Sequence, residues 1–589
     1  MGLPRAIEAH KQGDLAEAMR QYQRAFDQGE ERQPLFQNYG ALLRQQGKND
    51  QALEVYERGI SCNPNDVGVL TNRGNLIRQD KPASALSDLF KALRLRIANG
   101  DKPQECSDLL RSVISLSGDL GLRSWQMALI RFGLTWQGPE PRLLGQVLIV
   151  LDGLAANADA ITDSPRDEVR EQLVDLLEQR IRRCEPRPQA ELRLALAGHT
   201  MLRGDLDQAL HLYKLGLEAL REPGDIDPHE AQERQKLLDV NSWNFGCGLL
   251  QSQELLRGWQ LYEYGLRTPA DGPQRWQRAL RKPFAATVLP IWRGESLVGK
   301  RLLLLEEQAI GDVMMFLTLL PDLLQEASSV DLMLSERLVP IYRRSLGKSV
   351  KIWTHSDAHK GRFSANDYDF QSPLGSICQH RFTKLESYAR RTPMLIAKNS
   401  RRDKLRKDYI SACEQPVERL IGISWKGGGT AGRIRAKSIS TQKFSQLLKP
   451  IPGVRFVSLQ YGKVANQVDD WRRSGLDVIH DPRVDALRDM ELWLDQVAAC
   501  DAVISVANTT IHGAGGLNLP TQCLLSLQSD WRWFNDPAVK RSYWYPSVGI
   551  LREDASHGWN RVLKYARQWL EEQCPRPTGP ISTRVQAAS

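Results

Sequence analysis

The chain lacks the features that mark disulfide-rich, metal-binding and membrane-spanning proteins. Its nine cysteines are dispersed over 589 residues, and no two of them form a Cys-x-x-Cys pair. This pattern argues against a disulfide framework and a zinc site, and it favours a reducing compartment. No apolar run reaches membrane-spanning length, and the first residues lack the apolar segment of a secretory signal. We therefore expect a cytoplasmic protein with no resident metal or cofactor.

The sequence also lacks long blocks of like charge. Lys plus Arg exceed Asp plus Glu by 79 − 70 = 9, and the basic residues are scattered. This mild excess suits an anionic ligand such as a sugar nucleotide, and a solvated basic surface explains it equally well. Basic and aromatic residues do not alternate as they do in proteins that bind single strands, so we expect no nucleic-acid partner. No glycine-rich segment matches the P-loop, so kinase-type phosphate chemistry finds no support.

The first hundred residues repeat themselves. A shift of 34 positions aligns residues 38–45 with 72–79, with five identities, and Tyr22 with Tyr56. A 34-residue period with small residues where paired helices meet is typical of tetratricopeptide repeats. Repeat character returns at 204–213. Such repeats stack into a superhelix whose concave face commonly holds a protein segment.

From about residue 290 the pattern changes to short apolar runs that alternate with amphipathic segments. This alternation predicts parallel sheets covered by helices, and a Lys- and Arg-rich break at 398–415 divides the region in two. The expected strands are 301–305, 330–334, 350–354, 420–424, 454–459, 476–480, 501–506 and 521–525. The expected domains are tetratricopeptide repeats (1–98), a helical region (99–190), further tetratricopeptide-like repeats (191–267), an N-terminal Rossmann-like domain (286–412), a C-terminal Rossmann-like domain (413–572) and a disordered tail (573–589).

One strand–loop–helix segment predicts a phosphate-bearing ligand. The apolar run 503–506 leads into Asn508, Thr509 and Thr510, and then into a glycine-rich helix start that carries His512. In an open α/β sheet, ligands bind beyond the carboxyl ends of the strands, and a helix N-terminus there offers free N–H groups to an anion. The alternative is an ordinary strand–turn–helix connection with a helix cap.

Several motifs in the second half resemble the heptosyltransferase superfamily, in particular the branch in which tetratricopeptide repeats precede the transferase. The resemblance covers about residues 290 to 570. Its motifs are Trp292 to Leu297, Glu307 to Asp312, Ile421 to Gly428, Phe456 to Gln460, and the segment from Val503 to His512 followed by Asp530-Trp531-Arg532-Trp533. The resemblance implies a GT-B fold of two Rossmann-like domains that face each other, and transfer of a sugar from a nucleotide-sugar donor without a metal ion.

The resemblance also implies a catalytic base. In this family an Asp that follows a Gly, in the loop after the first strand, is the proposed base, and Gly311 and Asp312 occupy that place. Gln308 and Gly311 in the same loop are expected substrate contacts. The alternative is that Asp312 caps a helix that begins at Val313, since Asp is a favoured N-cap residue.

A diphosphate site is implied in the other domain. The family places a Lys seven residues before an aromatic residue, as Lys437 stands before Phe444. Arg435 lies beside it, and Lys426 opens the same loop, so these cations are the expected phosphate contacts. A solvated basic loop is the alternative.

The motif departs from the family at one position. Where an Asp is usual before the His, this chain has Ala507, although His512 is kept. Two hypotheses follow. The first is an inverting glycosyltransferase whose repeat arm selects a protein or peptide acceptor, and the second is an inactive scaffold or binding protein of the same fold. The sequence leaves the sugar, the nucleotide, the acceptor and the oligomeric state open, and it assigns the tryptophans near residue 532 to packing.

Overall fold

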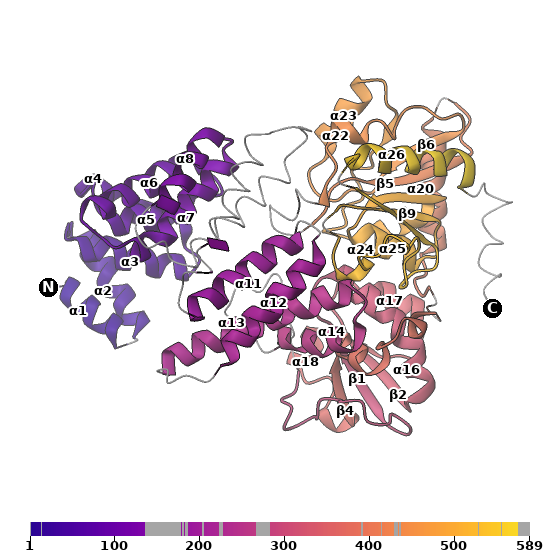
Figure 1. Cartoon of the computed structure of the whole chain (residues 1–589), viewed down its shortest axis with the longest axis horizontal. Coiled ribbons are helices and arrows are strands. Elements are labelled where there is room, and N and C mark those ends of the chain that lie inside the picture. The colour runs from indigo at the N-terminus through magenta and orange to yellow at the C-terminus, as the bar shows by residue number, and fades with distance from the viewer. Residues whose placement is uncertain are drawn as a thin grey trace. The chain divides into compact units, whose positions relative to one another are not determined.

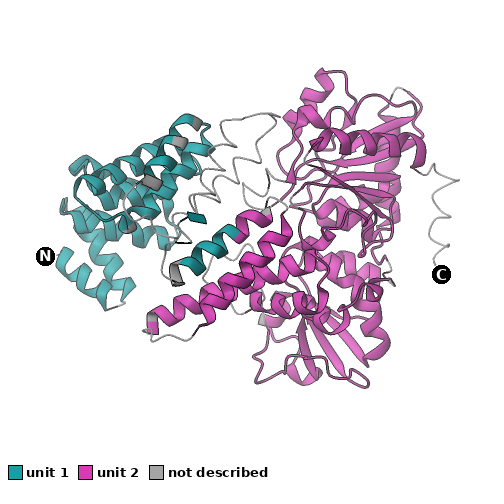
Figure 2. Cartoon of the chain, in the orientation of Figure 1, with its two compact units in different colours: residues 1–155, 163–196 teal, residues 156–162, 197–589 magenta. Residues whose placement is uncertain are grey.

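The structure is a computed structural model, and it describes most of the chain. The described residues are 2–135, 178–179, 182, 186–266 and 283–574, apart from residues 13, 203–204, 223–227, 390, 392, 414, 429–433, 435–436, 528 and 555. The helical segments expected between 136 and 177, most of the expected connection at 268–285, Arg435 and the tail from 575 lie outside the described residues. The described chain forms two compact units that divide between Leu196 and Ala197 (Figure 2).

The first unit is built from helices that pack in consecutive pairs, α1 with α2, α3 with α4, α5 with α6 and α7 with α8 (Figure 1). Helix pairing at the 34-residue period confirms the tetratricopeptide prediction. The helices are α1 (Gly2–Lys11), α2 (Leu15–Asp27), α3 (Gln33–Gln45), α4 (Asn49–Cys62), α5 (Val67–Ile77), α6 (Pro82–Ala98), α7 (Pro103–Asp119) and α8 (Arg123–Thr135).

Small residues explain why the paired helices approach closely. A Cβ at Gly40 would lie 2.2 Å from Tyr56 Cε1, and one at Gly74 would lie 2.8 Å from Leu89 Cγ. Tyr22 and Tyr56 are fully buried, as large residues that fill the space between helices must be. The repeated Gly and Tyr positions are therefore packing positions.

The second unit begins with helices that continue the repeat pattern. They are α11 (Pro186–Leu202), α12 (Leu206–Arg221), α13 (Pro228–Gln251), α14 (Leu255–Tyr262) and the 3-10 turn η1 (Glu263–Leu266), and the division between the units falls within α11. Asp205 caps α12 by accepting from the Gln208 N–H, as Asp14 caps α2 by accepting from the Glu17 N–H. The segments 14–27 and 205–221 thus form helices that begin with the same cap, and the repeat character of 191–267 stays a prediction.

The last helical pair packs directly on the α/β half, and this differs from the expected division near 268–285. Trp259 and Tyr262 of α14 are buried, and each ring centroid lies 5.4 Å from that of Trp531. The Gln251 side chain at the end of α13 donates to the Ser529 carbonyl at 2.6 Å, and the Gln251 backbone carbonyl accepts from the Asn535 N–H at 2.7 Å. Because these contacts bury large aromatics, α12 to α14 belong with the α/β half.

The first α/β domain contains a four-stranded parallel sheet of order β3-β2-β1-β4. Its strands are β1 (Arg301–Leu305), β2 (Ser329–Met333), β3 (Ile352–Trp353) and β4 (Phe370–Pro373). The helices between and beside them are α15 (Ile310–Phe316), α16 (Leu320–Glu326), α17 (Val339–Leu346), α18 (His355–His359) and α19 (Cys378–Arg381), with 3-10 turns at Leu317–Leu319, Ala365–Asp367, Leu374–Ile377 and Leu385–Tyr388.

The second α/β domain contains a six-stranded parallel sheet of order β10-β9-β8-β5-β6-β7. Its strands are β5 (Arg419–Ser424), β6 (Val454–Ser458), β7 (Val478–Ile479), β8 (Ala502–Val506), β9 (Thr521–Leu525) and β10 (Val548–Arg552). Its helices are α20 (Asn399–Ser411), α22 (Thr441–Phe444), α23 (Ala465–Arg473), α24 (Met490–Ala499), α25 (Thr509–Gly516) and α26 (Gly558–Gln568), with the 3-10 turn η7 (Trp531–Trp533) and the π-helical turn η8 (Trp569–Gln573).

These strand orders define where a ligand would bind. In the second sheet the chain starts at β5, moves outward through β6 and β7, and then returns to β8 on the other side, which is the doubly wound Rossmann order. The first sheet starts at β1 and reverses direction before β4 in the same way. Ligands bind beyond the carboxyl ends of the strands at such reversal points. The predicted fold class, a helical-repeat half followed by two Rossmann-like domains, is confirmed.

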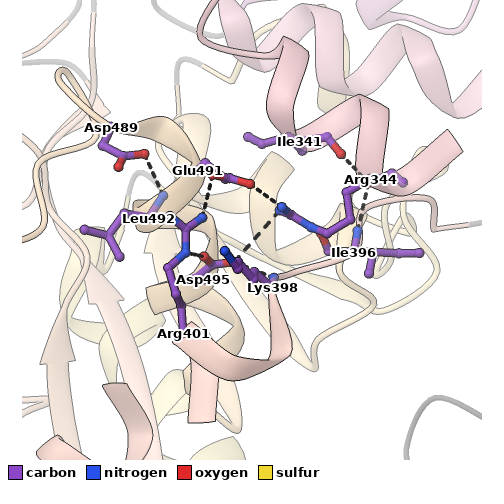
Figure 3. A network of polar contacts seen from close by, with 10 residues as sticks. Ile341, Arg344, Ile396, Lys398, Arg401, Asp489, Glu491, Leu492 and Asp495 are labelled. Carbon is purple, nitrogen blue, oxygen red and sulfur yellow. Dashed lines mark hydrogen bonds and ion pairs between the residues drawn. The ribbon is translucent and has the colours of Figure 1, made fainter. Parts of the chain in front are cut away.

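A polar network joins the two α/β domains (Figure 3). Arg344 of α17 pairs with Glu491 of α24, and Arg401 of α20 pairs with both Glu491 and the fully buried Asp495, each at 2.6 Å. The Lys398 N–H donates to Asp495 at 2.7 Å. Since α20 packs against α24, it belongs to the second domain, and the boundary lies before it rather than at 412. Among the described helices, none is long and apolar enough to cross a membrane.

Candidate functional site

The candidate site lies where loops from the carboxyl ends of both sheets meet. The loop after β1 leads into α15, the loop after β5 leads to Lys437, and β8 leads into α25. The loop after β9 carries Asp530 and Arg532. These loops adjoin the two reversal points, so side chains from opposite domains come into contact there.

Asp312 is buried in the first turn of α15. This helix begins at Ile310, so Asp312 is its third residue and not the cap of a helix that starts at Val313. Its Oδ2 accepts from the Ala309 N–H at 3.3 Å, and its Oδ1 accepts from Arg532 Nε at 2.5 Å. Asp312 therefore stabilises the start of its helix and also forms an ion pair with the other domain.

Four alternating charges form what we call the charge chain: Asp312, Arg532, Asp530 and Lys437. After the 2.5 Å pair of Asp312 with Arg532, Arg532 Nη1 lies 3.2 Å from Asp530 Oδ2, and that oxygen lies 2.7 Å from Lys437 Nζ. Burial alone would raise the pKa of Asp530, but Lys437 and Arg532 hold this pKa well below its ordinary value. Burial opposes the charge of Arg532 too, and Asp312 and Asp530 nevertheless raise the pKa of its guanidinium. Asp530 and Arg532 are therefore both charged at neutral pH.

His512 lies beside the charge chain on α25. Its ring is buried, its Nδ1 lies 3.1 Å from the Tyr545 hydroxyl, and its centroid lies 5.8 Å from that of Trp533. Burial lowers the pKa of His512 to about 4, although Asp312 acts to raise it. The imidazole is therefore neutral near pH 7, and it can contact a ligand as a hydrogen-bonding group but not as a cation.

Gly311 explains how α15 and α25 come so close. A Cβ at this position would lie 2.8 Å from His512 Cδ2, which is below van der Waals contact. The glycine thus places the backbone of the Asp312 turn against the His512 ring. Its expected role as a substrate contact is untested, and its packing role is clear.

Gln308 connects the site to the helical half of the unit. Its backbone has φ of 59°, a conformation that non-glycine residues rarely adopt and that is often found at functional sites. The side-chain Nε2 donates to the Tyr262 hydroxyl of α14, and Oε1 accepts from Arg532 Nη2 at 3.2 Å. The last repeat helix therefore supports the loop that presents Asp312.

Asn508 caps α25 and joins two strand ends. Its Oδ1 accepts from the Thr510 N–H at 2.9 Å, and its Nδ2 donates to Ser424 Oγ at 2.7 Å and to the Lys426 carbonyl at 3.0 Å. Both amide hydrogens are thus used within the protein. The side chain holds the ends of β5 and β8 together and orients the start of α25.

The remaining predicted contacts occupy different environments. Thr509 is the first residue of α25 and is half-buried, whereas Thr510 is buried and its Oγ1 has no hydrogen-bond partner. Lys426 is exposed, and its N–H donates to Gln460 at 2.8 Å. Arg435 lies outside the described residues.

The structure therefore brings Gln308, Gly311, Asp312, Lys437 and His512 together. It does so through Asp530 and Arg532, which sequence reasoning did not assign to the site. The sequence did hold a signal for them. Both residues follow the apolar strand β9, so they lie at the same sheet edge as the loops after β5 and β8. Within the described parts of the chain, no group of three His, Cys, Asp or Glu residues is arranged to hold a metal ion.

Comparison with known proteins gives distant similarities. No family model matches the chain. Protein FlbA of Caulobacter vibrioides is 27% identical over 295 residues, which are 46% of this chain and 46% of FlbA. The chain thus matches about half the length of this curated relative.

The solved structures that match include glycosyltransferases and tetratricopeptide-repeat proteins. A family 9 glycosyl transferase from Veillonella parvula is 12% identical, with a TM-score of 0.31, over 44% of this chain and 87% of its own. The ADP-heptose LPS heptosyltransferase II of E. coli is 14% identical, with a TM-score of 0.33, over 46% of this chain and 97% of its own. The tetratricopeptide protein YrrB is 16% identical, with a TM-score of 0.23, over 36% of this chain and 97% of its own. At these scores the fold assignment rests on the strand order and helix pairing described above.

Proposed function

We propose that this protein is an inverting glycosyltransferase that moves a sugar from a nucleotide-sugar donor to an acceptor chosen by the helical half. The observation that carries the proposal is the charge chain. It joins the candidate base Asp312 of one domain to the candidate phosphate ligand Lys437 of the other, where both sheets reverse their strand order. His512 and the N-terminus of α25 lie at the same edge.

The geometry supports a one-step displacement. The acceptor oxygen attacks the anomeric carbon while the bond from that carbon to the diphosphate breaks, and the diphosphate leaves with the bonding electrons. Asp312 takes the proton of the acceptor hydroxyl. Lys437 and the positive end of the α25 dipole stabilise the negative charge on the leaving diphosphate, so that no metal ion is required.

The helical half supports a protein or peptide acceptor. Tetratricopeptide repeats commonly bind protein segments, and the contact of Tyr262 with Gln308 connects the last repeat helix to the loop of Asp312. Dispersed cysteines, of which those described are free thiols, suit a reducing cytoplasmic setting.

A second candidate is a binding or scaffold protein that keeps the fold without turnover. One specific observation favours it: both carboxylate oxygens of Asp312 already accept hydrogen bonds, from Ala309 and Arg532. Ala507 adds to this, because it supplies no carboxylate where the resembled family has one.

The test is binding and hydrolysis of a panel of nucleotide sugars. Calorimetry with ADP, UDP, GDP and CMP should detect at least one ligand, and the matching nucleotide sugar should be hydrolysed slowly. Lys437→Ala should weaken binding roughly tenfold, as expected for loss of one charge-assisted hydrogen bond. Lys449→Ala, on an exposed turn, is the matched control and should bind as the wild type does. Binding without hydrolysis would support the scaffold, and no binding at all would contradict the glycosyltransferase.

A further inference from the structure

The charge chain has no net charge, which is unexpected for a site that binds a diphosphate. Two carboxylates, Asp312 and Asp530, neutralise two cations, Arg532 and Lys437. Asp530 Oδ2 contacts both cations at once, at 3.2 and 2.7 Å. An incoming diphosphate must therefore compete with carboxylates for each cation.

Arg532 is held so that its guanidinium can exchange partners while its backbone stays in place. Its carbonyl accepts from Trp544 Nε1 at 3.1 Å, and its N–H donates to Asp530 Oδ1 at 3.2 Å. The guanidinium carbon lies 4.4 Å from the centroid of the Trp531 ring, which supports the guanidinium by a cation–π contact. Its polar partners are side chains, namely Asp312, Asp530 and Gln308.

We infer that Arg532 is a ligand of the donor diphosphate and that Asp312 holds its guanidinium in the empty enzyme. Donor binding then draws the guanidinium away from Asp312. The Asp312 carboxylate is thereby released to act as the base. This inference rests on the proposed function and deepens it. A guanidinium suits the exchange because the geometry of its N–H donors matches both carboxylate and phosphate oxygens.

The exchange resolves a conflict within the site. A carboxylate whose oxygens accept from Arg532 and Ala309 has little capacity to take a proton from an acceptor hydroxyl. Once Arg532 turns to the diphosphate, Oδ1 of Asp312 becomes available, while Oδ2 keeps its contact with Ala309. The base therefore becomes active only when the donor is in place, and the acceptor is not deprotonated unproductively.

Inorganic pyrophosphate is the probe that tests this inference, because it presents the diphosphate without sugar or base. Asp530→Asn removes the competing charge, and its amide oxygen still accepts from the Arg532 N–H. We expect this variant to bind pyrophosphate roughly tenfold tighter than the wild type, since a charge-assisted contact no longer has to be broken. Arg532→Gln should bind roughly tenfold more weakly, for loss of one such contact.

Asp536→Asn is the matched control. Asp536 lies in the same loop and caps the Ala538 N–H at 2.8 Å, and it holds no cation of the charge chain. This variant makes the same change of charge and should leave the affinity for pyrophosphate unchanged. If Asp530→Asn does not fold, Asp312→Asn releases Arg532 from the other side and should tighten binding as well.

The outcomes separate this inference from the proposed function. Tighter binding by Asp530→Asn and weaker binding by Arg532→Gln, with no response of any variant to a nucleotide or nucleotide sugar, would support the diphosphate ligand and contradict the glycosyltransferase. Nucleotide binding by the wild type that neither variant changes would overturn the inference and leave the proposed function in place. An equal gain in pyrophosphate affinity in Asp536→Asn would also overturn the inference, because the gain would then come from the change in the net charge of the protein.

Discussion

Replacing Gly311 by alanine tests whether the close approach of α15 to α25 is a requirement of the site. The added Cβ would lie 2.8 Å from His512 Cδ2, whereas carbon atoms pack at about 3.5–4.0 Å. The His512 ring has little freedom to move away, because its Nδ1 is hydrogen-bonded to the Tyr545 hydroxyl and the Trp533 ring packs beside the imidazole. Overpacking costs about 1–3 kcal/mol, and alanine gains at most about 1 kcal/mol over glycine in a helix. We therefore expect a net loss of roughly 1–2 kcal/mol.

The assay is chemical unfolding followed by tryptophan fluorescence, with nucleotide binding measured in parallel. Gly198→Ala is the matched control, since its Cβ would meet Tyr213 Oη at 3.6 Å, an ordinary contact, in a helix of the same unit. That variant should be unchanged or slightly more stable. Equal stability and equal nucleotide affinity in Gly311→Ala and the wild type would refute the packing argument.

Three further predictions concern pH, chain division and the interdomain network. Burial lowers the pKa of His512 from 6.5 to about 4, so only the unfolded chain takes up this proton as the pH falls below 6.5. Neutral His512 therefore contributes its full share of the unfolding free energy near pH 7.5, and about 2 kcal/mol of that free energy is lost by pH 5. Denaturant unfolding at a series of pH values should show this loss in the wild type and not in His512→Asn. The same pH dependence in both proteins would contradict the prediction. A fragment of residues 1–267 exposes Trp259 and Tyr262, which pack on Trp531 in the whole chain, and it should therefore aggregate. A fragment of residues 186–574 keeps these contacts and should stay soluble. A soluble 1–267 fragment would refute the assignment of α14 to the α/β half. Arg344→Ala should lower the unfolding free energy by roughly 1.5–3 kcal/mol, because partly buried Glu491 loses one of its two cationic partners and keeps Arg401. Replacement of the exposed Arg488 by alanine should leave the unfolding free energy unchanged.

Much of the fold was predictable because parallel strands buried on both faces read as continuous apolar runs. All eight expected strands are present, and the 34-residue period identified the paired helices. Two strands were missed. β4 carries Gln371, which is buried only because its Nε2 donates to the carbonyls of Phe284 and Leu289. β10 lies at the edge of its sheet and is only partly buried, so its apolar signal is weak.

The division of the chain could not be read locally. Trp259 and Tyr262 have the helical spacing of any buried repeat residue, and only the tertiary structure shows that they pack on Trp531. The same holds for the site. Asp312 and Arg532 are 220 residues apart, and their pairing depends on how two domains meet. The residue types and the loop positions were predictable from the sequence, but the ion-pair partner of each charged side chain was not.

In the proposed function, Asp312 is the base of a glycosyl transfer. Asp312→Asn tests it directly, because asparagine can still accept from the Ala309 N–H but cannot take the acceptor proton. The measurement is turnover of the nucleotide sugar identified by the binding panel, with Asp536→Asn as control. Turnover should fall roughly a hundredfold or more, while the fold is kept and the nucleotide is bound at least as tightly as by the wild type. Near-normal turnover in Asp312→Asn would contradict the claim and leave Asp312 as a residue that stabilises its helix and the ion pair with Arg532.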